Sequence, residues 1–201
     1  GERRRDLLAW LRRRDAIVLE DDYDAEYRYD RAAVGALQGL DPGRVVYAGS
    51  ASKTLAPALR LGWLVVPPWL VADVADEKDL ADCGTARIDQ HAFAGFLSRG
   101  ELDRHLRRMR TRYRRRRDLL LDELARALPE ATVRGIAAGL HATVELPDGH
   151  DERAILRHAR RRGIDLTTMR EFWIPPGAGS PTLLVGYAQL PIPAIPDAVH
   201  T

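Results

Sequence analysis

Lysine is almost absent from this chain, although 30% of its residues are charged. The 31 Lys+Arg residues include lysine only at Lys53 and Lys78. Cysteine occurs once, as Cys83, which excludes an internal disulfide and fits a reducing cytoplasm. No run of about 18 apolar residues is present to span a membrane, and no secretory signal opens the chain. We therefore expect a cytoplasmic globular protein without membrane association, and we interpret a chain that starts at Gly1 as a fragment.

Lys53 lies in a turn of small residues that directly follows the apolar run Val45–Tyr47. A primary amine on a turn between a strand and a helix can condense with a carbonyl to form an imine, whereas a guanidinium cannot. Taken alone, the position is better explained as a surface lysine in an arginine-rich chain. The residues upstream change that balance.

The upstream segment is a short apolar run, Ala16–Glu20, followed by acidic and aromatic residues. Such a run is typical of a buried parallel strand, and loops beyond the carboxyl ends of these strands hold ligands. Asp21 and Tyr23 stand two apart, so they project on the same side of extended backbone. A carboxylate and a phenol near a lysine suit pyridoxal phosphate, with the carboxylate on the pyridinium nitrogen and the phenol at the ring oxygen. A solvated loop is the alternative, and a metal site is less favoured because no nearby His or Cys completes a ligand set.

Three segments carry a resemblance to a known family: residues 20–29, 47–63 and 90–110. They resemble the aminotransferase-like domain of the MocR regulators, which are GntR-type bacterial transcription factors related to fold-type I aminotransferases. The third segment looks like the one that joins the large and small domains in that family. The order of the segments along the chain agrees with the family.

The resemblance implies a set of cofactor-binding residues. Lys53 matches the Schiff-base and catalytic lysine, Asp21 the partner of the pyridine nitrogen, and Tyr23 the residue near the ring hydroxyl. Ser50, Ser52 and Arg60 match positions that bind the cofactor phosphate. Hydroxyls and a guanidinium fork suit a phosphate dianion, although the two serines also suit plain turn or cap positions.

The hydrophobic pattern and the resemblance together predict an α/β chain with part of a fold-type I large domain followed by a small α+β domain. In the first part, residues 1–100, we expect a parallel-rich sheet with helices. The pattern predicts a helix at Arg5–Arg13, strands at Ala16–Glu20, Val45–Ala48 and Leu61–Val66, and a helix that begins near Pro68.

The second part, residues 101–201, begins with apolar residues at helical spacing from Leu102, which predict one long linking helix that ends before Pro129. Alternation over residues 140–146 predicts a half-exposed strand. A helix at Asp151–Arg162 and a strand at Leu183–Tyr187 follow. The proline-rich stretch at residues 191–196 departs from a simple helical ending.

Arginine is concentrated in residues 107–117, including the run Arg114–Arg117. A basic stripe can mark a nucleic-acid interface. A solvated face of an amphipathic helix explains it better, because acidic residues are plentiful and the net charge is only +2. We likewise interpret His91, His105 and His141 as structural, since no metal-ligand spacing links them.

Two functions remain in contention. The first is a pyridoxal-phosphate-binding effector domain of a homodimeric transcriptional regulator, which binds an amino compound and contacts DNA only through a winged helix outside this chain. The second is a fragment of a class I/II aminotransferase, so transaminase activity stays open. A dimerisation module that has lost its ligand is less favoured, because Lys53, Asp21 and Tyr23 are all present.

One departure weakens the enzyme interpretation. Many aminotransferases place a carboxylate-binding arginine near the last strand of the small domain, but residues 182–187 contain none. Arg170 is the nearest candidate for binding a substrate carboxylate. We also expect the 201 residues alone to bind pyridoxal phosphate poorly, because part of a fold-type I site would come from upstream residues.

Overall fold

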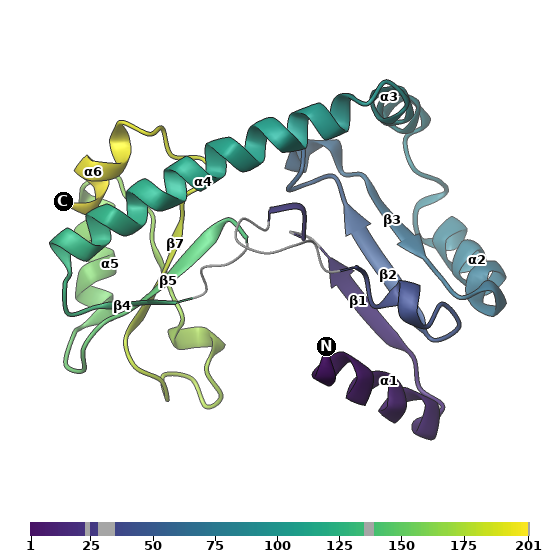
Figure 1. Cartoon of the computed structure of the whole chain (residues 1–201), viewed down its shortest axis with the longest axis horizontal. Helices are drawn as coiled ribbons and strands as arrows, with labels where there is room; N and C mark the ends of the chain where they lie inside the picture. The colour runs from purple at the N-terminus through teal and green to yellow at the C-terminus, as the bar shows by residue number, and fades with distance from the viewer. Residues whose placement is uncertain (23–24, 28–34, 135–138, 201) are drawn as a thin grey trace. The chain divides into compact units, whose positions relative to one another are not determined.

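The computed structural model describes residues 1–22, 25–27, 35–134 and 139–200. The described residues divide into two compact units. The first lies within residues 1–106, apart from Tyr27, and the second comprises residues 107–200 together with Tyr27. Figure 1 shows a sheet in each unit.

The first unit is built on a three-stranded sheet in the order β1-β2-β3. The strands are β1 (Val18–Asp22), β2 (Val45–Ser50) and β3 (Gly62–Val65). All three predicted strands are therefore confirmed, and β1 runs two residues further than expected, over both aspartates. β1 and β2 are parallel, as predicted, and pair in an unbroken register over five residues of each strand.

β3 is antiparallel to β2, so the sheet is mixed rather than wholly parallel. The reason lies in the connection, because the chain between β2 and β3 stays at one edge and contains only a short 3-10 turn, η3 (Pro57–Leu59). A parallel pair needs a crossover across the sheet, usually a helix. Alternation of apolar residues predicts a strand but carries no information on its direction.

α1 (Glu2–Arg14) packs against the face of the sheet that bears Val18 and Val45, and Figure 1 shows the helix next to β1. The helix begins three residues before the predicted range, Arg5–Arg13. It buries two leucines against the sheet, with partly buried residues around them. The apolar cluster under the helix consists of Leu8, Leu11, Leu37 and Val45, with Ala16 and Val18 packed against it.

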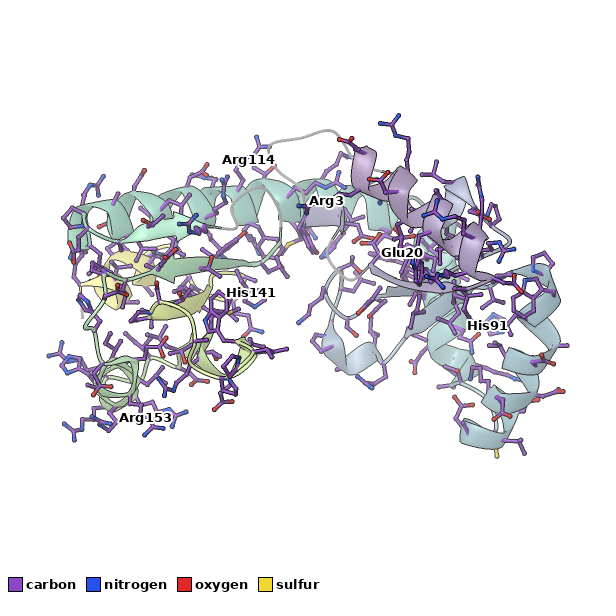
Figure 2. All side chains as sticks on the ribbon, turned by 90° about the horizontal axis from the view of Figure 1, so that it is seen from below. Arg3, Glu20, His91, Arg114, His141 and Arg153 are labelled. Carbon is purple, nitrogen blue, oxygen red and sulfur yellow. The ribbon has the colours of Figure 1, made fainter. Side chains whose placement is uncertain are left out.

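Glu20, labelled in Figure 2, ties the segment before η2 (Gln38–Leu40) to β1. Its carboxylate accepts hydrogen bonds from the backbone N–H groups of Leu37 at 2.7 Å and Gln38 at 2.9 Å. Arg4 from α1 lies 3.5 Å from the same carboxylate. The partly buried Glu20 carboxylate thus connects β1 with α1 and with the backbone at Leu37 and Gln38.

Two helices follow β3. The predicted start near Pro68 is a 3-10 turn, η4 (Pro68–Leu70), that leads into α2 (Val71–Asp82). α3 (Arg87–Ser98) comes next and is not among the predicted helices.

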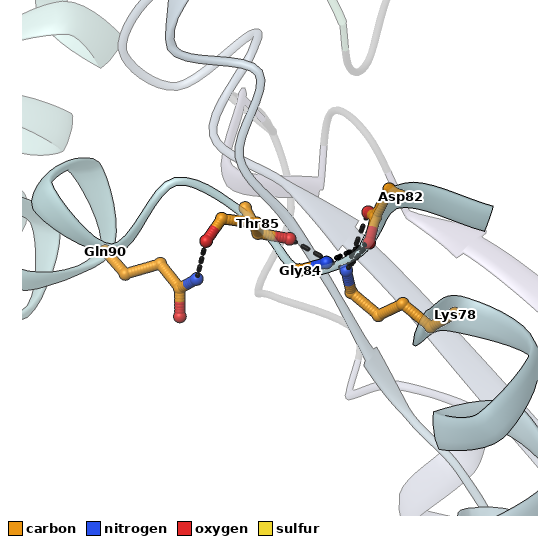
Figure 3. Close-up of polar contacts among 5 residues, drawn as sticks. All are labelled: Lys78, Asp82, Gly84, Thr85 and Gln90. Atoms are coloured by element: carbon orange, nitrogen blue, oxygen red, sulfur yellow. Dashed lines mark hydrogen bonds and ion pairs between the residues drawn. The ribbon is translucent and has the colours of Figure 1, made fainter. Parts of the chain in front are cut away.

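Lys78 closes the end of α2, as Figure 3 shows. Its ammonium group lies 2.7 Å and 2.9 Å from the two carboxylate oxygens of Asp82 and donates to the Thr85 hydroxyl at 2.9 Å. Gln90 of α3 donates to the Thr85 carbonyl. This lysine therefore has a structural explanation, namely a compact cation that bridges two groups in the connection between helices.

The second unit contains a four-stranded antiparallel sheet in the order β4-β5-β7-β6. Its strands are β4 (Thr132–Arg134), β5 (His141–Glu145), β6 (Thr167–Thr168) and β7 (Thr182–Gly186). The alternation predicted for residues 140–146 is confirmed, since its apolar side chains are buried while His141 is exposed. The short strands β4 and β6 were not predicted.

Three helices accompany this sheet: α4 (Glu101–Ala127), α5 (Glu152–Arg161) and α6 (Ala194–Val199). The long helix and α5 agree with the predicted ranges within one residue or two. α6 corrects the expectation of a non-helical ending. Pro196 lies in its first turn, where a missing N–H removes no intrahelical hydrogen bond.

The arginine run on α4 divides between solvent and protein. Arg114 and Arg115 are exposed, and Arg114 projects outward in Figure 2. Arg116 instead donates to the carbonyl of Ala188, and Arg117 is only 9% exposed. The prediction of a solvated face therefore holds for Arg114 and Arg115 only, because Arg116 and Arg117 pack within the second unit.

The first unit offers a direct test of packing at Gly49. A β-carbon at this position would lie 2.4 Å from the Trp63 indole, which stacks on Phe93 of α3 with ring centroids 6.1 Å apart. We expect Gly49→Ala to displace this aromatic pair and lower the free energy of unfolding by about 1–3 kcal/mol, the range for overpacking. Gly39→Ala is the matched control, since nothing lies within 4 Å of its β-carbon position. Urea unfolding of both variants measures the difference, and equal stability would contradict the packing.

Candidate functional site

The carboxyl ends of β1 and β2 meet at one edge of the first sheet. The parallel register places Asp21 beside Ala48 and Asp22 beside Gly49, so the two strands finish together. The chain then forms a loop and returns through Gly62, which pairs with Ser50. Residues 51–61 therefore lie at the edge where Asp21 lies, which is where α/β sheets bind ligands.

Lys53 lies in a tight, internally bonded turn in this loop. The N–H of the buried Ala51 donates to the Leu61 carbonyl at 2.9 Å, and the Ala51 carbonyl accepts from the N–H of Leu55 at 2.9 Å. Lys53 itself is exposed, and Thr54 beside it is only 4% exposed. The backbone of the turn is thus fixed on the protein side while the lysine side chain is accessible.

Ser50 and Ser52 are coupled within the same turn. The Ser52 backbone N–H donates to the Ser50 hydroxyl oxygen at 3.0 Å. This bond uses an acceptor site of Ser50 and leaves its hydroxyl hydrogen out of the contact. Ser50 therefore retains the ability to donate to an anion at the sheet edge, in addition to acting as a turn residue.

Strand geometry separates the roles of the two aspartates. Neighbouring residues of a strand point to opposite faces, and residues paired across strands share a face. Asp22 lies on the face of Val18 and Val45, which α1 covers. Asp21 lies on the opposite face, where Leu19 is 67% exposed. Asp21, the carboxylate predicted from the sequence to bind a ligand, is therefore the exposed one of the two, and its role stays a prediction.

Asp22 has a protein partner that the sequence did not reveal. The Tyr47 hydroxyl on β2 donates to an Asp22 carboxylate oxygen at 3.2 Å. Burial, and then the nearby Asp22 charge and this hydrogen bond, raise the pKa of Tyr47 to about 12. Tyr47 therefore stays a hydrogen-bond donor at neutral pH, and its contact with Asp22 lies on the covered face.

Arg60 ends the loop in an unusual backbone conformation. It follows η3 with a φ of 49° and a ψ of 28°, the left-handed region that non-glycine residues rarely adopt. Its side chain is exposed at the same edge as Lys53. Backbone strain of this kind persists where the surroundings require it and is found at ligand sites.

Arg170 belongs to the second unit. It begins η5 (Arg170–Phe172), and its carbonyl accepts from the N–H of Gly177 at 2.9 Å. Its side chain lines a cavity of about 400 Å³ together with Asp151 and Arg153. The cavity lining carries both acidic and basic side chains, so Arg170 shares it with other charged groups of either sign.

Of the predicted site residues, the structure gathers Asp21, Ser50, Ser52, Lys53 and Arg60 at one edge of the first sheet. Tyr23 lies outside the described residues. The described part of the chain contains no group of three His, Cys, Asp or Glu side chains arranged to hold a metal ion. None of the helices in these same residues is long and apolar enough to cross a membrane.

Comparison with known proteins identifies the family of the chain. The family described as aminotransferase class I and II matches residues 2–176. The uncharacterised HTH-type transcriptional regulator YhdI of Bacillus subtilis is 35% identical over 190 residues, which cover 94% of this chain and 40% of the regulator. The probable rhizopine catabolism regulatory protein MocR of Rhizobium meliloti is 35% identical over 182 residues, 89% of this chain and 36% of MocR.

A solved structure extends the comparison to the fold. Kynurenine aminotransferase of Pyrococcus horikoshii, in complex with PMP, superposes with a TM-score of 0.89 at 29% identity. The match covers 100% of this chain and 50% of that enzyme. The chain thus spans half of the enzyme and less than half of the regulators.

The fold is that of the fold-type I pyridoxal-phosphate-dependent transferases, represented here by part of the large domain and a small α+β unit. The chain belongs to the class I and II aminotransferase family. The matches to YhdI and MocR confirm the resemblance to the MocR regulators that the sequence motifs indicate.

The Tyr47–Asp22 contact predicts a specific alkaline response. A folded-state pKa of about 12 against an ordinary value of 10.0 means that the stabilisation is complete below pH 10 and is lost as the pH rises towards 12. We expect Tyr47→Phe to be less stable by about 1 kcal/mol at neutral pH, the scale of one hydrogen bond, and to lose stability less steeply above pH 10. Unfolding in urea between neutral pH and pH 12 measures both, and an unchanged alkaline slope would contradict the contact.

Proposed function

We propose that this chain is the pyridoxal-phosphate-binding, aminotransferase-like effector domain of a GntR/MocR-type transcriptional regulator. The observation that carries the proposal is the register of β1 with β2, which brings an open carboxylate to the edge that bears the exposed Lys53. The matches to YhdI and MocR support the regulatory context.

The residues at the sheet edge fit the cofactor in chemical type. A phosphate monoester needs hydrogen-bond donors and positive charge, which Ser50, Ser52 and Arg60 offer. The strained backbone of Arg60 supports a functional reason for a guanidinium at that point. The open Asp21 suits the pyridine nitrogen, since a carboxylate keeps that nitrogen protonated.

In this proposal Lys53 provides the amine that attaches the cofactor covalently, and Asp21 orients it and maintains its ring charge. Tyr23 is proposed to contact the ring oxygen. Pyridoxal phosphate, when bound, supplies an electron sink for chemistry on amino compounds. Tyr47 donates a hydrogen bond to Asp22 on the covered face, so that Asp22 has a protein partner and Asp21 is the carboxylate proposed to face the ligand.

The partners are part of the same proposal. We expect a small amino compound as effector, a homodimer, a cytoplasmic location, and DNA contact through a domain that these 201 residues do not include. Arg170 is retained as the candidate for a ligand carboxylate. The large domain is proposed to end near residue 100, where the linking helix begins.

A class I/II aminotransferase is the second candidate, favoured by the superposition on kynurenine aminotransferase. The two functions share their cofactor residues and differ in the outcome of ligand binding. If the complete protein converts an added amino acid into its keto acid, the enzyme is favoured. If an amino acid changes the affinity of the protein for its promoter DNA without turnover, the regulator is favoured.

Covalent attachment at Lys53 is directly testable because the chain has only two lysines. We expect the complete protein to take up pyridoxal phosphate with visible absorbance, and borohydride reduction to fix the label on the peptide that contains Lys53. Lys53→Ala should abolish the absorbance and the label, because no other lysine lies in this turn. Peptide mass mapping measures the labelled position.

Lys78→Ala is the matched control. Its amine is engaged with Asp82 and Thr85, so we expect this variant to load like the parent protein. Label that persists in Lys53→Ala and disappears in Lys78→Ala would overturn the assignment.

The two aspartates give a second, internally controlled test. Asp21→Ala removes the open carboxylate, so we expect cofactor affinity to fall about tenfold, which corresponds to about 1.4 kcal/mol. Asp22→Ala removes the partner of Tyr47 and should weaken folding more than binding. Titration with pyridoxal phosphate, followed by absorbance, compares the two variants. Equal losses of affinity would mean that the faces of β1 are assigned wrongly.

A further inference from the structure

His105 contacts the turn that carries Lys53. It is the fifth residue of α4, and its Nε2 atom lies 2.8 Å from the backbone carbonyl oxygen of Thr54, the residue after Lys53. The two residues are 51 positions apart in the chain and belong to the same unit. The contact is partly buried, and Thr54 is only 4% exposed.

The chemistry of this contact fixes which atom carries the proton. A backbone carbonyl only accepts, so Nε2 of His105 must be the donor, in either the neutral or the charged ring. The same turn is closed from within by the bond from Leu55 N–H to the Ala51 carbonyl and by the Thr54 hydroxyl on that carbonyl. His105 adds a hydrogen bond from outside the loop, at the Thr54–Leu55 peptide group, one residue beyond Lys53.

We propose that His105 is a positioning residue for Lys53. By holding the carbonyl of Thr54, it fixes the backbone direction from which the lysine side chain leaves the turn, and so the point at which the amine meets a bound carbonyl. This inference depends on the proposed role of Lys53 in cofactor attachment. It also gives a function to a histidine that the sequence suggested was only structural.

The position of His105 on its helix adds to the argument. α4 continues without interruption from residue 101 to residue 127, and His105 precedes the division between the two units by two residues. The lysine turn is therefore bonded to the one described helix that both units share.

The test compares three variants of the complete protein loaded with pyridoxal phosphate. His105→Leu removes the donor, whereas His105→Gln keeps an N–H that reaches a similar point. His91→Leu is the control, since His91 is an exposed histidine on α3 (Figure 2). The measurements are the rate of cofactor loss and the visible circular dichroism per bound cofactor, with unfolding in urea measured in parallel.

We expect His105→Leu to lose cofactor about tenfold faster, the scale of one hydrogen bond to a buried group. Its visible circular dichroism per bound cofactor should fall, because the cofactor is attached at an altered angle. His105→Gln should restore both, and His91→Leu should match the parent protein.

Three outcomes would overturn the inference. The first is a His105→Leu variant whose visible circular dichroism and rate of cofactor loss both equal those of the parent protein. The second is reduced stability in both His105 variants with unchanged dichroism, which would make the contact structural only. The third is a parent protein without attachment at Lys53, which would reject the proposed function itself and the role of His105 with it.

Discussion

The parallel pairing of β1 with β2 is the constraint on which the site depends. The register from Val18 opposite Val45 to Asp22 opposite Gly49 sets which strand ends coincide. A shift of one residue would turn Asp21 towards α1 and bring Asp22 to the open face. The hydrophobic cluster under α1 resists that shift, because it would carry Val18 out of the core. The burial of Val18 at the start of β1 therefore determines which aspartate lies on the open face at the end of the strand.

Much of this arrangement could be predicted from the sequence. The three apolar runs indicate the strands of the first unit. The spacing of Asp21 and Tyr23 predicts a shared side, and the structure places Asp21 on the face of β1 that α1 does not cover. The resemblance to the MocR regulators adds the expected roles of Ser50, Ser52 and Arg60. These inferences depend on local patterns, which carry the information needed for strand periodicity and for a turn of small residues.

The remaining features depend on contacts between distant residues. The direction of β3 is set by the course of the loop before it, and the Tyr47–Asp22 bond by the register of two strands. The sequence pattern places Arg116 and Arg117 in a solvated stripe, but the small domain engages them through Ala188 and through burial. The contact of His105 could not be predicted because its partner is a backbone carbonyl, a group that no sequence pattern marks.

The scarcity of lysine has a consequence for selectivity. Aldehydes react with exposed primary amines wherever they find them, and arginine does not form such adducts under the same conditions. With 29 arginines and two lysines, the chain carries a large positive charge that is inert to a carbonyl reagent. Both lysine side chains are exposed, and Lys78 also contacts Asp82 and Thr85. Imine chemistry on side chains is thus confined to two positions, and replacing either lysine leaves a single side-chain amine for chemical labelling.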